Sequence, residues 1–246
     1  MKLVTLNVWG GRMKDKLDEF VQQRSDVDIF CFQEVYHEAQ GKDTTFLDNT
    51  DFDHLTFLKE HMPGYTAIYH PHLGDWWGLA MFVKNSLEII DMGEVYVHKQ
   101  KGYNYDLEVQ GYTAKNLQYI TLATTEGERT IINFHGLWNN NGKEDSDARL
   151  LQSQNIIAFL KTLEHPYILA GDFNLSPSTV SISMLEDHGM RNLIKEFGAF
   201  STRTYLYKKE NKFADYVFVS GGIDALDFSV LPDVVSDHSP LYLEFK

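Results

Sequence analysis

Apolar segments of strand length recur along the whole chain, and this periodicity limits the folds that the sequence can adopt. Alternating or continuous apolar runs predict strands at residues 2–8, 27–35, 65–70, 78–83, 87–97, 116–124, 129–134, 167–170, 214–219, 223–230 and 240–245. Fewer segments have helical spacing, at 13–24, 52–62, 145–163 and 178–188. The opening order of strand, helix and strand favours a βαβ-like start to an α/β domain.

The segments between these elements are polar. Residues 36–50 and 98–112 are predicted to be loops, 125–128 a hairpin turn, and 139–147 a solvated loop. Many strands with a few helices fit two mainly antiparallel sheets packed face to face, with helices outside. The predicted fold is therefore a four-layer α/β (α+β) sandwich. The sequence contains no repeat or linker, so one domain over residues 1–246 is the simplest organisation.

Composition narrows the class of function. Of the 246 residues, 43% are hydrophobic, which is enough for a large core, and the net charge is −13. Such a field repels polyanions, whereas proteins that grip long duplex DNA present a basic face. The charge therefore disfavours a duplex nuclease and favours a small substrate.

One cysteine, Cys31, lies in an apolar run and is predicted to be buried as a small hydrophobe. A single cysteine cannot form an internal disulfide. The first residues lack a long apolar signal region, and no run is long enough to span a membrane. These features predict a cytoplasmic protein, with neither a membrane partner nor a stable protein partner expected.

Polar side chains occur where predicted strands end, and strand ends meet at an edge of a sheet. These residues are Asn7, Glu34, His135, Asp172, Asn174, Asp215, Asp237 and His238. Carboxylates and amides suit hard cations such as Mg²⁺ or Mn²⁺. The sequence has no cysteine cluster and no His-x-x-x-His pair, which argues against zinc. A cation with nearby acids and bases is the equipment that phosphate ester hydrolysis needs.

The same motifs in their order closely resemble the endonuclease/exonuclease/phosphatase superfamily, whose fold is deoxyribonuclease-I-like. The resemblance covers residues 3–245, and its most distinctive marks are Gly171-Asp172-Phe173-Asn174 and Ser236-Asp237-His238. It implies a phosphodiesterase, phosphatase or nuclease, a hydrolase that uses Mg²⁺ or Mn²⁺ and takes a phosphate ester, with nucleic acid as an alternative partner.

The resemblance also implies roles for individual residues. Metal binding falls to Asn7, Glu34 and Asp237, and catalysis to His135, Asp172, Asn174, Asp215 and His238. Asp172 matches the carboxylate that prepares the attacking water. His135, Asn174 and His238 match groups that contact phosphoryl oxygens, and Asp215 matches the carboxylate that orients an imidazole. Arg149 and Tyr105 are further candidates for contact with phosphate or substrate.

Several alternatives remain open at this stage. Trp9 stands where abasic-site endonucleases tend to carry Asp, which weakens that assignment, and Asn-x-Trp-Gly is nearer to sphingomyelinase-type relatives. The candidates are a small phosphodiester or phosphomonoester, short or damaged DNA or RNA, a sphingomyelin-like lipid, or a non-catalytic binding module. The Trp76-Trp77 pair is either packed in a turn, which we favour, or part of a rim that contacts a ligand.

Overall fold

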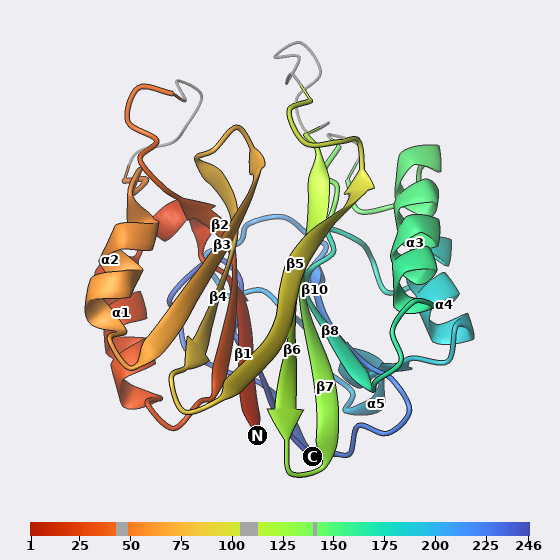
Figure 1. Ribbon diagram of the computed structural model, residues 1–246. Coiled ribbons are helices and arrows are strands. Elements are labelled where there is room, and N and C mark those ends of the chain that lie inside the picture. Colours follow the sequence, from red (N-terminus) through yellow and green to blue (C-terminus); the bar gives the residue numbers. More distant parts are fainter. Residues whose placement is uncertain (43–48, 104–112, 140–141) are drawn as a thin grey trace.

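Two six-stranded sheets packed face to face form the centre of the molecule in a computed structural model that describes residues 1–42, 49–103, 113–139 and 142–246 (Figure 1). The first sheet has the order β11 (Ala225–Val230), β12 (Leu241–Phe245), β1 (Lys2–Asn7), β2 (Ile29–Tyr36), β4 (Trp77–Lys84) and β3 (Tyr65–Leu73). The second has the order β5 (Glu88–His98), β6 (Lys115–Thr124), β7 (Gly127–His135), β8 (Tyr167–Asp172), β10 (Asp215–Val219) and β9 (Arg191–Asn192).

Helices cover the outer face of each sheet, which completes four layers (Figure 1). The first sheet carries α1 (Lys14–Gln23) and α2 (His54–His61). The second carries α3 (Asp147–Leu160), α4 (Val180–Asp187) and α5 (Leu193–Glu196). The predicted four-layer sandwich is confirmed. The sheets are mixed rather than purely antiparallel, because β1 pairs in parallel with β2 and β7 with β8.

The predicted elements are present with shifted ends, and three short ones escaped prediction, of which η1 (Trp9–Gly11) is a 3-10 helix of three residues. β9 has two residues and α5 has four, too few to show a period. The prediction that residues 139–147 form a solvated loop is wrong for Asn139 and Lys143, which are 1% and 7% exposed. Lys143 is held in place because its ammonium donates to the carbonyl of Phe213.

Alternating side chains divide the core between the layers. Leu3 and Cys31 belong to the cluster between the sheets, whereas Val4 and Phe30 belong to the cluster under α1 and α2. Adjacent strand residues point to opposite faces, so both faces of the central strands are apolar. The thiol of Cys31 is buried and free, as its apolar setting predicts. No described helix is both long and apolar enough to cross a membrane.

Buried amides join the two sheets. Gln33 on β2 donates to Oδ1 of Asn133 on β7 at 2.7 Å, and Asn133 donates back to the carbonyl of Phe32 at 3.0 Å. Asn133 also donates to Oε1 of Gln118 at 3.1 Å. Because an unpaired buried amide is costly, these contacts restrict how the sheets can slide past each other.

The turn after β1 packs against a buried histidine. Gly11 has φ +71°, and a Cβ there would lie 2.7 Å from Cγ of His54. His54 is fully buried, and neither of its ring nitrogens has a hydrogen-bond partner within the described part of the chain. Burial lowers the pKa of His54 from 6.5 to about 4.

This histidine makes stability sensitive to acid. The pKa of His54 is lower in the folded state than in the unfolded state. Above about pH 6.5 the ring is neutral in both states and costs no stability. As pH falls below 6.5, the unfolded state takes up a proton more readily, so the free energy of unfolding decreases. Between pH 7 and pH 5 we expect the wild type to lose about 2 kcal/mol more of its free energy of unfolding than His54→Gln does. Urea denaturation of both proteins at the two pH values measures this difference. Equal losses would show that His54 is not responsible.

Candidate functional site

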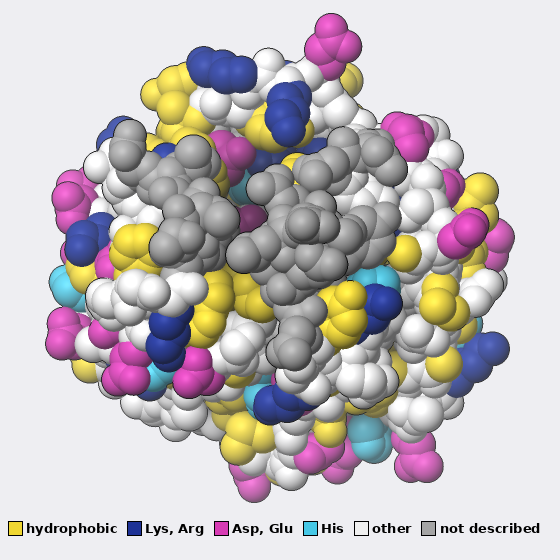
Figure 2. All heavy atoms as spheres, turned by 90° about the horizontal axis from the view of Figure 1, so that it is seen from above, with side chains coloured by type: hydrophobic (Ala, Val, Ile, Leu, Met, Phe, Trp, Pro, Cys, Tyr) yellow, Lys and Arg dark blue, Asp and Glu magenta, His cyan; other side chains and the backbone are white. Residues whose placement is uncertain are grey.

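The strand register lines up polar residues along one edge of the second sheet. Asp172, the last residue of β8, pairs with His135 on β7 and with Asp215 on β10. Across the interface, β1 ends at Asn7, beside the end region of β2. These strand ends lie at the end of the molecule opposite to the two termini (Figure 1). Seen from that end, acidic, histidine and basic side chains lie together in a recess near the middle of the face (Figure 2).

A single amide links the carboxylates of the two sheets. Nδ2 of Asn7 donates to Oε1 of Glu34 at 2.9 Å and to Oδ2 of Asp172 at 3.0 Å. Oδ1 of Asn7 accepts from the backbone N–H of Trp9 at 2.9 Å, which fixes the amide orientation. Both hydrogens of the amide are therefore directed at carboxylates, one on each sheet.

Glu34 reaches this point through an irregular backbone. Its φ is +60°, and the pairing of β2 with β4 shifts register between Phe32 and Val35. A bulge of this kind re-aims a side chain, and a positive φ at a non-glycine residue is held only by surrounding structure. Burial, together with the charges of Asp237 and Asp172, raises the pKa of Glu34 to about 7. The hydrogen bond from Asn7 and the charge of Lys115 offset only part of this effect.

His135 faces both carboxylates from β7. Its Nε2 lies 3.8 Å from Oε1 of Glu34 and 3.9 Å from Oδ2 of Asp172. Burial, and next the charge of Lys115, hold the pKa of His135 well below its usual value, so the ring is neutral at pH 7. A neutral imidazole keeps one nitrogen free to accept a hydrogen bond or to ligate a metal.

His238 and Asp215 form a buried pair. Nδ1 of His238 lies 2.8 Å from Oδ1 of Asp215, and its Nε2 lies 3.6 Å from Oδ2 of Asp172. Burial lowers the pKa of His238 to about 3 and raises that of Asp215 to about 6. At pH 7 the ring is therefore neutral, with Nδ1–H donating to Asp215 and Nε2 turned toward Asp172.

Asp237 is held by a cation. Nη1 of Arg203, which is 5% exposed, donates to Oδ2 of Asp237 at 3.0 Å, while Oδ1 of Asp237 is buried and without a hydrogen bond in the described structure. The backbone of Arg203 also pairs with His238 in an isolated bridge. The segment before β10 thus fixes both Asp237 and His238.

The loop after β8 turns back at Asn174. This residue has φ +55°, a conformation that asparagine tolerates better than most residues, and its backbone N–H donates to Oδ1 of Asp172 at 2.8 Å. Its side-chain Nδ2 lies 3.4 Å from the carbonyl of Gly136. Asn174 therefore both restrains the Asp172 carboxylate and lies next to it.

Arg149 lies elsewhere in the fold. The side chain is 1% exposed, and it donates to the backbone carbonyls of Leu137, Gly142 and Glu144. These contacts hold the loop before α3 and differ from the phosphate contact expected for this residue. Tyr105, the other expected substrate contact, lies outside the described residues.

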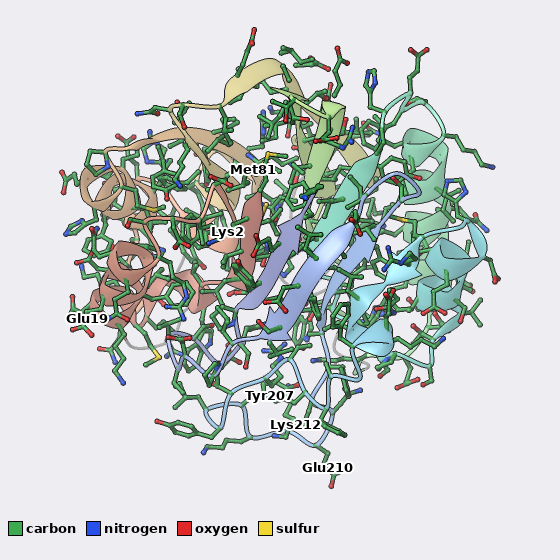
Figure 3. The ribbon with its side chains drawn as sticks, turned by 90° about the horizontal axis from the view of Figure 1, so that it is seen from below. Lys2, Glu19, Met81, Tyr207, Glu210 and Lys212 are labelled. Carbon is green, nitrogen blue, oxygen red and sulfur yellow. The ribbon has the colours of Figure 1, made fainter. Side chains whose placement is uncertain are left out.

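Two lysines near the cluster belong to none of the sequence motifs and were not predicted as site residues. Lys115, 2% exposed on β6, lies with its ammonium 5.1 Å from the ring centre of Trp77, and burial lowers its pKa to about 8. Lys143 lies on the opposite side, where its ammonium is 5.0 Å from the ring centre of Tyr207. Tyr207 and Lys212 lie close together on the long segment before β10 (Figure 3). The only signal of this kind in the sequence is Lys115, a lysine at the start of an otherwise mostly apolar strand.

The Trp76-Trp77 pair is packed, as favoured from the sequence. Trp76 stacks on the ring of Tyr36 at 5.9 Å between centroids. Trp77 meets His72 edge to face at 4.8 Å and His135 at 5.6 Å. Trp77, which is half-buried, thus packs beside His135.

Two groups of side chains could hold a metal ion. Ligand atoms of Glu34, His135 and Asp172 lie within 4.8 Å of one another, as do those of Asp172, Asp215 and His238. The first group contains Glu34, whose pKa is raised by burial and by the charges of Asp237 and Asp172. Oδ1 of Asp237 lies 3.8 Å from Nε2 of His238. Oxygen donors with one imidazole fit Mg²⁺ or Mn²⁺. The second group is already joined by the hydrogen bond between His238 and Asp215.

Comparisons with known proteins agree with this arrangement. The Endonuclease/Exonuclease/phosphatase family model matches residues 4–238, so the chain belongs to that family. Among curated proteins, none matches. A solved Bacteroides thetaiotaomicron protein of the family is similar, with a TM-score of 0.78 and 18% identity over 100% of this chain and 94% of that one.

Two further solved structures share the fold. The Bacteroides thetaiotaomicron mannosyl-6-phosphatase has a TM-score of 0.76 at 19% identity, covering 100% of this chain and 99% of its own. The human Nocturnin catalytic domain with bound sulfate has a TM-score of 0.68 at 18% identity, covering 100% and 94%. At these identities the similarity establishes the deoxyribonuclease-I-like fold.

The backbone at Gly171 packs closely against the neighbouring strand, and a substitution can test this packing. A Cβ on Gly171, which has φ +144°, would lie 2.0 Å from the carbonyl oxygen of Phe134 on the neighbouring strand. We expect Gly171→Ala to lower the free energy of unfolding by about 3 kcal/mol. Thermal and urea melts measure the loss. Gly64→Ala is the matched control, because a Cβ there meets nothing within 4 Å, and a similar loss in both variants would contradict the packing argument.

Proposed function

We propose that the protein is a metal-dependent phosphoesterase that hydrolyses a small phosphodiester or phosphomonoester by in-line attack of water. The observation that carries the proposal is the convergence of Glu34, Asp172, His135 and His238 from both sheets on one point. Several carboxylates and neutral imidazoles this close together favour a bound cation and a bound anion together.

Glu34 holds the metal in this proposal, with Asn7 and Asp237 beside it and His135 and Asp172 within reach. A divalent ion there supplies positive charge for the phosphoryl and leaving oxygens. Oxygen donors and a neutral imidazole are compatible with Mg²⁺ or Mn²⁺, and the buried Oδ1 of Asp237 has no hydrogen bond in the described structure.

The remaining residues act on water and phosphate. Asp172 accepts a hydrogen bond from the attacking water and takes its proton, while the Asn174 backbone keeps the carboxylate in place. His238, protonated at Nε2 when the phosphate anion is bound, donates to a phosphoryl oxygen, and Asp215 balances the charge at Nδ1. His135 and the Asn174 amide contribute further contacts to the phosphate oxygens.

The net charge of the protein and the solved structures of similar proteins support the proposed substrate class. The net charge of −13 and the buried position of the cluster favour a small substrate over duplex nucleic acid. The solved mannosyl-6-phosphatase supports a phosphomonoester, and Nocturnin with its bound sulfate supports an anion site. A non-catalytic module is disfavoured because the residues named for chemistry are all present.

Hydrolysis of bis-p-nitrophenyl phosphate tests the proposal. We expect activity with Mg²⁺ or Mn²⁺, its loss with a chelator, and its return when the metal is restored. Asp172→Asn should reduce kcat by about 10³-fold, because the base is lost while the shape is kept. Asp227→Asn, exposed on β11, is the control and should match the wild type. Activity that survives both the chelator and Asp172→Asn would refute this mechanism.

The Asp215–His238 pair gives a second, independent prediction. In Asp215→Asn the amide cannot balance an imidazolium, so kcat should fall about 10- to 100-fold with little change in KM. Steady-state kinetics with the best substrate from a panel of sugar phosphates, nucleotides, short oligonucleotides and sphingomyelin measures both constants. A change confined to KM would assign Asp215 to substrate binding instead.

A further inference from the structure

Lys115 is a buried cation with no hydrogen-bond or ion-pair partner among the described residues. It is 2% exposed, and no carboxylate of the described chain lies within the 4.0 Å that defines an ion pair with it. The other cations near the cluster are occupied, since Arg203 donates to Asp237 and Lys143 donates to a backbone carbonyl. Burying an ammonium without a partner is costly, so its retention indicates a partner that comes with the substrate.

The sheet places Lys115 at one end of the row of site residues. The strand order β6, β7, β8, β10 puts Lys115 on the strand next to that of His135, followed by the strands of Asp172 and Asp215. Lys115 and His135 both contact the ring of Trp77, at 5.1 Å and 5.6 Å from its centre. The groups proposed to act on the scissile phosphate lie at the ends of β7 and β8, in the loop after β8 and in the loop before β12. Lys115 is therefore next to the reacting phosphate rather than opposite the attacking water.

Aromatic rings surround the ammonium of Lys115. Its ammonium lies 5.1 Å from the ring centre of Trp77, and the rings of His72, Trp77 and His135 meet edge to face at 4.8 to 5.8 Å. Trp77 Nε1 and His135 Nδ1 are also buried without hydrogen bonds in the described structure. The charge of Lys115 acts on Glu34 and Asp172 without an ion pair, so its N–H donors stay available above the ring of Trp77.

We propose that Lys115, with Trp77 and His72 around it, forms a subsite for a second anionic group, so that the substrate is a phosphate ester that carries another phosphate. This inference rests on the proposed function, because it places the scissile phosphate at His135 and Asp172. The second phosphate could belong to a sugar or to a nucleoside. In either case the ammonium makes charge-assisted hydrogen bonds to its oxygens.

Calorimetric titration at constant free Mg²⁺ tests the subsite without requiring turnover. The probes form two matched pairs: fructose 6-phosphate with fructose 1,6-bisphosphate, and adenosine 5′-phosphate with adenosine 3′,5′-bisphosphate. In at least one pair the wild type should bind the bisphosphate about 10-fold or more tightly than the monophosphate. The pair with the larger preference identifies the sugar or nucleoside source.

Substitution of the lysine then separates the subsite from other roles. Lys115→Met, which fills the same space without charge, should remove the preference while changing monophosphate affinity less than about twofold, and Lys115→Arg should restore part of it. Lys195→Met, an exposed lysine paired with Glu186, is the control. Thermal melts confirm that the variants fold.

The inference is overturned if the wild type shows no preference in either pair, or if Lys115→Met weakens monophosphate and bisphosphate equally. Equal weakening would mean that Lys115 contacts the scissile phosphate itself.

The outcome of this binding experiment is separate from that of the hydrolysis assay. A bisphosphate preference without chelator-sensitive hydrolysis would uphold the subsite and reject the phosphoesterase, and the reverse result would do the opposite.

Discussion

The amide of Asn7 is the contact on which the arrangement of the site depends. One side chain, fixed by the backbone of Trp9, directs both of its hydrogens at carboxylates that come from different sheets. The carboxylates repel each other, and an amide between them reduces that repulsion while setting their separation. The relative position of the two sheets is thus coupled to the geometry of the site, and the buried amides of Gln33 and Asn133 extend the same coupling into the core.

Backbone irregularity supplies what regular strands cannot. A regular strand would turn Glu34 into one face or the other of the first sheet, and the bulge with φ +60° instead aims it at the strand ends of the second. Asn174 makes a comparable turn after β8, where its own N–H restrains Asp172. Such strain of about 1–3 kcal/mol per residue is tolerated because the surrounding sheets are extensive and well packed.

The sequence was sufficient for the layers, most elements and the order of the motif residues, because these follow from periodicity and from residue type at strand ends. It was insufficient for contacts made by single side chains far apart in the chain. Arg149, in a helix next to a motif, donates to three backbone carbonyls, which no local pattern indicates. Lys143, in a polar run typical of a solvated loop, is buried by the segment before β10. Neither outcome is encoded locally, since each depends on which distant backbone covers the residue.

The distribution of charge explains how an acidic protein can select an anion. The net charge of −13 acts at long range and is screened over roughly 10 Å at 0.1 M salt, whereas a buried ammonium acts over a few ångströms through a low-dielectric interior. Polyanions experience the surface field along their whole length, and a small ester experiences mainly the site. Within the site, Arg203 and Lys143 lie toward Asp237 and Tyr207, while Lys115 lies toward Trp77. In the proposed function, a cation held by the central carboxylates lies between these two positive ends. An anion bound across that cation would meet positive charge on both sides, which suits the compact, multiply charged phosphate ester that we propose.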